Sequence, residues 1–72
     1  MSNFPSLTPG ELINLLEKKG FVLKHIHGSH HYFVHPESGK ITVVPMHTKD
    51  LPKGTLHAIL KQAGLDKGDI LK

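Results

Sequence analysis

The sequence of 72 residues contains no cysteine and no long run of apolar residues. Without cysteine, neither a disulfide framework nor a thiolate metal site can reinforce the small core that a chain of this length buries. No apolar stretch approaches the roughly 20 residues of a membrane span, and residues 1–5 lack the basic and apolar regions of a signal peptide. We therefore expect one domain, residues 1–72, in the cytoplasm.

Arginine is also absent, since all nine basic residues are lysines, and with six acidic residues they give a formal charge of +3. This balance suits a polyanionic partner such as nucleic acid. Lysine carries a point charge rather than the planar fork of arginine, so the composition favours contacts to phosphate over recognition of base sequence. The seven histidines gain charge as the pH falls through about 6.5, so polyanion binding should strengthen in mild acid.

The positions of proline, glycine and apolar residues predict two helices. Thr8-Pro9-Gly10-Glu11 has the form of a capping box with a proline at the first helical position, and Gly20 can end that helix, which predicts a helix over Pro9–Lys19. A later helix is predicted to hold Pro52 in its first turn and to end at Gly64. Its apolar stripe consists of Leu56, Ile59, Leu60 and Ala63.

Three runs between these helices have the pattern of strands separated by short turns. The predicted strands are Phe21–Ile26, His30–His35 and Ile41–Val44, and the turns are His27–Ser29 and Pro36–Gly39. We therefore expect an α+β protein of order α-β-β-β-α, in which two helices cover one face of a three-stranded antiparallel sheet. This order resembles the double-stranded-RNA-binding domain.

The motifs that carry a family resemblance lie at the first turn and after the third strand. They are Gly28-Ser29-His30 followed by Tyr32 and His35-Pro36, and Val44-Pro45-Met46-His47 followed by Leu51-Pro52-Lys53-Gly54-Thr55-Leu56. Together with Leu16–Phe21 and Ile59–Leu65, these motifs extend over nearly the whole chain. On these residues, the chain resembles the HicA family of toxins from bacterial toxin–antitoxin pairs. The resemblance implies the same double-stranded-RNA-binding-domain-like fold and a toxin of a type II system. It also implies an endoribonuclease that cuts mRNA without the ribosome, and a HicB-type antitoxin as partner.

The family's catalytic histidine closes the Gly-x-His motif, and the resemblance therefore implies that His30 is catalytic. Imidazole can take or give a proton near neutral pH, so His30 can act on the 2′-hydroxyl or on the leaving 5′ oxygen. The second proton carrier stays open among His47, Tyr32 and water, and His47 is the better candidate for a catalytic helper. No metal cofactor is expected. For RNA binding we expect contributions from Lys24, Gly28, Ser29, Lys49 and Lys53, of which the last two flank a predicted helix N-terminus.

Other interpretations stay open from the residues alone. His25 and His27 point the same way on an extended segment and could ligate a metal, although no cysteine or carboxylate stands near them in the sequence. Ser29 has no recognisable triad around it. The chain could also bind RNA without cutting it, or serve only to bind an acidic protein such as an antitoxin. Strand alternation separates His30 from His31 but does not say which of them faces the core.

Overall fold

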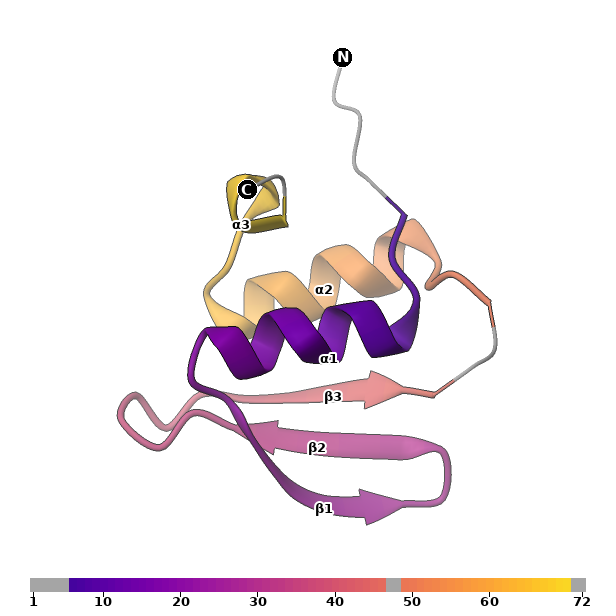
Figure 1. Ribbon diagram of the computed structural model, residues 1–72. Coiled ribbons are helices and arrows are strands. Elements are labelled where there is room, and N and C mark those ends of the chain that lie inside the picture. The colour runs from indigo at the N-terminus through magenta and orange to yellow at the C-terminus, as the bar shows by residue number, and fades with distance from the viewer. Residues whose placement is uncertain (1–5, 47–48, 71–72) are drawn as a thin grey trace.

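The computed structural model describes residues 6–46 and 49–70 (Figure 1). Its helices are α1 (Pro9–Lys18), α2 (Lys53–Ala63) and α3 (Lys67–Ile70), and its strands are β1 (Val22–His27), β2 (His30–Val34) and β3 (Ile41–Pro45). The strands form one antiparallel sheet in the order β1-β2-β3. The predicted α+β fold is confirmed. No helix in the described part of the chain is long and apolar enough to cross a membrane.

Helix α1 begins where the capping box predicts. The Glu11 N–H donates to Thr8 Oγ1 at 3.2 Å, and the Thr8 N–H donates to Glu11 Oε1 at 2.9 Å, so two amide groups of the first turn are satisfied. The helix ends at Lys18, one residue before the predicted end, and Gly20 follows with φ +96°. A left-handed residue at this point lets the chain reverse toward β1.

The core lies between the two long helices and one face of the sheet. Both helices lie beside β3 (Figure 1), and they contribute to one apolar cluster with the strand residues Phe33 and Val44. Thr42 also points into this layer, 1% exposed, where its hydroxyl donates to Gln62 Oε1 of α2 at 3.0 Å. The buried apolar residues are Leu12, Leu16, Phe21, Phe33, Val44, Leu51, Leu56, Ile59, Leu60 and Ala63.

Strand register assigns the remaining strand residues to one of two faces. We call the face toward the helices the covered face; its residues are Leu23, Ile26, His31, Phe33, Thr42 and Val44. We call the other side the open face. From one end to the other, the open face consists of the cross-strand rows Val22–Val34–Ile41, His25–Tyr32–Val43 and His27–His30–Pro45.

A bulge in β1 is required for this arrangement. Leu23 pairs with Phe33 and His25 pairs with Tyr32, which leaves Lys24 as the extra residue. In a regular strand Leu23 and His25 would share a face. The bulge shifts the alternation by one residue, so that Leu23 lies on the covered face while His25 lies on the open face.

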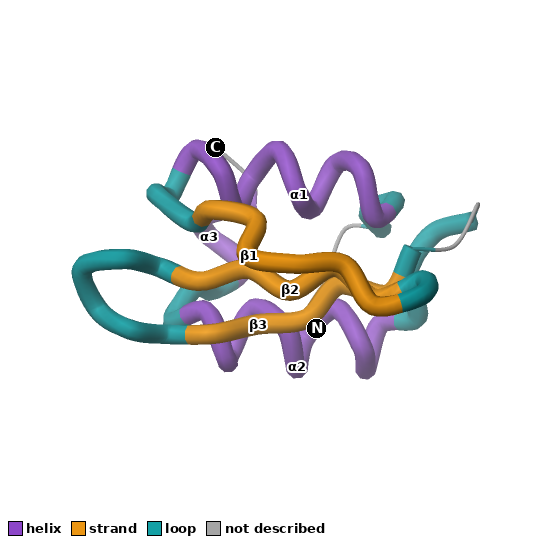
Figure 2. Tube along the Cα trace, turned by 90° about the horizontal axis from the view of Figure 1, so that it is seen from below, coloured by secondary structure: helices purple, strands orange, loops and turns teal. Residues whose placement is uncertain are grey.

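The second predicted strand ends one residue early, at Val34, and the His35 ring holds the turn that follows. Its Nδ1 accepts from the Ser38 N–H at 3.1 Å, and its Nε2 donates to the Lys19 carbonyl at 3.1 Å. The ring thus ties the β2–β3 connection to the end of α1. This connection and the β1–β2 turn lie at opposite ends of the sheet (Figure 2).

Candidate active site

The β1–β2 turn positions His30. The turn is Gly28–Ser29 rather than the predicted three residues, because His27 still pairs with His30 across the strands. Gly28 has φ +60°, and a glycine with positive φ at the first of two turn residues is the pattern of a type II′ hairpin. The Ser29 carbonyl accepts from the Met46 N–H at 2.6 Å. The tip of the hairpin is therefore fixed to the end of β3.

His30 is the first residue of β2 and is exposed on the open face. Its cross-strand neighbours are His27 on β1 and Pro45 on β3. Residues directly opposite each other in an antiparallel pair have Cβ atoms about 4.5–5.5 Å apart. His27 and His30 therefore stand side by side and both reach solvent.

The row next to His30 on the open face contains an aromatic stack. The rings of His25 and Tyr32 lie 4.3 Å apart between centroids, with 17° between their planes. Tyr32, which the sequence suggested as a possible proton carrier, thus lies beside a histidine that the sequence suggested as a metal ligand. Sequence reasoning missed this contact, because the predicted three-residue turn would set Lys24, not His25, opposite Tyr32.

The end of the sheet that carries His30 is also the end at which α2 begins (Figure 1). Lys49 lies in the preceding loop and Lys53 is the first residue of α2, and both are exposed. Lys24 is exposed in the bulge of β1, away from the hairpin tip. The structure therefore groups Gly28, Ser29 and His30 at the tip and sets Lys24 apart. His47, the suggested catalytic helper, lies outside the described residues.

The two long helices differ at their N-termini. The prediction of Pro52 in the first turn of α2 is off by one residue, since Pro52 is the N-cap and makes no side-chain capping bond. The first turn of α2 contains no acidic residue, whereas that of α1 contains Glu11. Uncapped amide groups beside Lys53 favour an anion such as a phosphate group.

His25 and His27 do share the open face, as the extended segment suggested. Within residues 6–46 and 49–70, no group of three or more histidine, aspartate or glutamate side chains has an arrangement that could hold a metal ion. The described residues thus supply the exposed imidazoles of His27 and His30 and the stacked rings of His25 and Tyr32.

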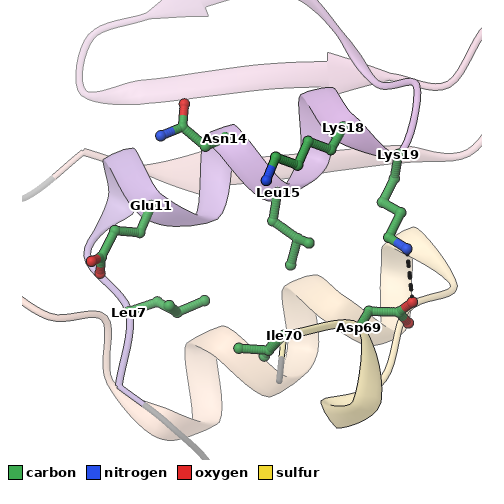
Figure 3. Close-up of a pocket in the computed structure, with 8 residues that line it drawn as sticks. All are labelled: Leu7, Glu11, Asn14, Leu15, Lys18, Lys19, Asp69 and Ile70. Atoms are coloured by element: carbon green, nitrogen blue, oxygen red, sulfur yellow. Dashed lines mark ion pairs between the residues drawn. The ribbon is translucent and has the colours of Figure 1, made fainter. Parts of the chain in front are cut away.

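A groove elsewhere on the molecule lies between α1 and α3 (Figure 3). Its lining residues are Leu7, Glu11, Asn14, Leu15, Lys18, Lys19, Asp69 and Ile70. Lys19 Nζ pairs with Asp69 Oδ1 at 3.0 Å. The Asp66 N–H donates to the Asp69 carboxylate at 2.9 Å, and this bond and then Lys19 hold the pKa of Asp69 below its usual value. None of the predicted site residues lines this groove.

Comparison with known proteins agrees with the motifs of the sequence. The model of the family described as HicA toxin of bacterial toxin-antitoxin matches residues 10–65. No curated protein matches the chain. The matched region includes the whole sheet, α2 and the hairpin tip with His30. Because the match extends over well more than half of the sequence, the chain belongs to the HicA family of toxins, which act within bacterial toxin–antitoxin pairs.

Proposed function

We propose that this toxin is an endoribonuclease that cuts mRNA with His30. Membership of the family implies an antitoxin partner, and we propose that this partner is of the HicB type. The observation that carries the proposal is the placement of His30, exposed at a fixed hairpin tip, at the same end of the sheet as the uncapped start of α2. A hairpin that holds an exposed imidazole near a helix N-terminus that favours anions supports proton transfer at a phosphodiester.

In the proposed reaction, His30 removes the proton from a ribose 2′-hydroxyl. The 2′ oxygen then attacks the adjacent phosphorus, the bond from phosphorus to the 5′ oxygen breaks, and the leaving oxygen receives a proton. The products are a 2′,3′-cyclic phosphate and a 5′-hydroxyl. DNA would not be cut, because it lacks the 2′-hydroxyl. Lys49 and Lys53 would offset the charge that develops on the phosphate.

The leaving oxygen needs a second proton carrier, and the register favours His27 for this role. His27 stands directly opposite His30 and is exposed on the same face. Tyr32 is one row further along the strand and stacks on His25, which makes it less suited to proton transfer at the same phosphate. The two histidines can also exchange the roles of base and acid.

The test is cleavage of a defined RNA by the purified toxin in the presence of EDTA. We expect fragments with cyclic phosphate ends from the wild type and a loss of about 10²- to 10⁴-fold in rate for His30→Ala. His57→Ala, which removes an exposed histidine on α2, is the matched control and should cut normally. Intact RNA, or equal cleavage by His30→Ala, would rule out the mechanism.

A second measurement separates His27 from other carriers. If His27 supplies the proton, His27→Ala should remove one limb of the pH dependence of kcat while leaving RNA binding unchanged. An RNA with a leaving group that needs no proton should then be cut at nearly the wild-type rate. An unaltered pH profile would assign the proton to another group.

A further inference from the structure

We propose that the stacked rings of His25 and Tyr32 form a platform on which an unpaired base of the RNA stacks, next to the phosphate at which the proposed cleavage by His30 takes place. The inference rests on the proposed function and adds how the substrate is held. It makes His25 and Tyr32 positioning residues for single-stranded RNA. The observations are the ring geometry, the position of β1 at the sheet edge and the change in chemistry along the open face.

The ring geometry leaves one aromatic surface available. His25 and Tyr32 are stacked at 4.3 Å and 17°, so each ring uses one of its two faces for the other. β1 is an edge strand, and His25 is exposed. The outer face of the imidazole therefore looks past the edge of the sheet, where a flat base can extend the stack.

The distance to His30 suits a single nucleotide. Tyr32 and His30 are two residues apart on the same strand and face, which separates their Cα atoms by about 6.7 Å in extended backbone. A base stacked on the His25–Tyr32 row would place its own ribose and phosphate near the His27–His30 row.

The chemistry of the open face changes in one direction along the strands. The row farthest from the hairpin tip is apolar, and its outer members Val22 and Ile41 are each 53% exposed. The middle row contains the stack, and the last row contains His27 and His30. Beyond it lies the end at which α2 begins with Lys53. A nucleotide has the same order of parts, from a flat apolar base to an anionic phosphate.

The test is RNA binding by the His30→Ala toxin, which leaves the RNA uncut. The probe is a short single-stranded oligoribonucleotide in which 2-aminopurine replaces each base in turn. We expect fluorescence quenching at one position. Adding His25→Ala should abolish the quenching and weaken binding by about 5- to 150-fold, the range seen when a stacking ring is removed. His25→Trp and Tyr32→Phe keep flat rings and should retain both signals.

A second oligonucleotide tests whether the ring acts through the base. At the quenched position the base is removed to leave an abasic ribose. This RNA should bind the His30→Ala toxin as weakly as the intact RNA binds the His25→Ala variant, and the two changes together should add no further loss. A merely structural role of His25 would weaken the binding of both RNAs by the same factor.

The outcomes separate the platform from the proposed function. Equal binding of intact and abasic RNA with no quenching at any position would overturn the platform, even if His30 proves essential for cleavage. Quenching that depends on His25, in a toxin that cuts no RNA, would support the platform and reject the nuclease. If His25→Ala weakens only the antitoxin complex, the open face binds protein and the platform is wrong.

Discussion

The two faces of the sheet differ although the same three strands form both. On the covered face Phe33, Thr42 and Val44 are at most 1% exposed, and they join both long helices into one core. On the open face the neighbouring residues in the chain are exposed or half-buried. The adjacent His30 and His31 show the contrast most clearly, since they lie on opposite faces. We infer that one face stabilises the fold and the other binds substrate.

The largest expected effect on stability comes from removing a buried ring of the covered face. Phe33→Ala removes a ring that is 1% exposed and should cost about 3–5 kcal/mol of unfolding free energy. That is a large share of the stability of so small a domain. Urea denaturation measures it. Val34→Ala, a change at the next residue on the open face, should cost much less, and equal losses would erase the distinction between the faces.

Replacing each of the adjacent histidines, His30 and His31, with leucine should separate effects on activity from effects on stability. His30→Leu should lower RNA cleavage by about 10²- to 10⁴-fold with little change in the urea midpoint. His31 Nδ1 is buried without a hydrogen-bond partner among the described residues, so replacing its ring with an apolar group should be neutral or stabilising. His31→Leu should therefore keep cleavage and stability. Loss of activity in both variants would contradict the assignment.

A smaller effect is expected at Thr42, a buried polar side chain of the covered face. Thr42→Val keeps the shape of the side chain and removes the bond from its hydroxyl to Gln62 Oε1. The loss should be about 1 kcal/mol, measured by urea denaturation. In the Gln62→Met background the same substitution should cost less, because the bond is already absent. An equal cost in both backgrounds would show that the bond contributes nothing.

The smallest effect is expected at the groove between α1 and α3, which belongs to neither face. The pKa of Asp69 is held below its usual value of 3.8 by the Asp66 N–H and by Lys19. A lowered carboxyl pKa stabilises the folded state above the usual value, and this contribution is lost as the pH falls through the folded value. Asp69→Asn should therefore lower the Tm slightly at pH 7, and the difference from wild type should shrink toward pH 3. RNA cleavage should not change, and a Tm difference that grows in acid would contradict the sign.

Local signals predicted the elements well. The Thr8 and Glu11 side chains form the expected capping box, and the strands match their predicted runs within one residue at each end. Such signals act over three or four residues, so they do not depend on how the rest of the chain packs. The errors are of one residue at the ends of elements, as at His35 and Pro52. His35 lies just after the strand, where its ring bonds to Lys19 and Ser38.

The candidate site was predicted in part. The family motif selects His30 among seven histidines, and the structure places it at an exposed hairpin tip. The stack of His25 on Tyr32 was not predicted, because the expected three-residue turn would set Lys24 rather than His25 opposite Tyr32. The pairing of His27 with His30 likewise depends on a turn of two residues rather than three.

The sequence by itself determined the order of elements, their caps and turns, and the histidine that belongs to the family motif. These depend on chemistry between near neighbours in the chain. Only the tertiary structure decided that Phe33 and not Tyr32 faces the helices, and that His25 and His27 share the open face with His30. The physical reason is that a strand offers two faces of similar composition. Packing against α1 and α2, together with the bulge at Lys24, selects between them.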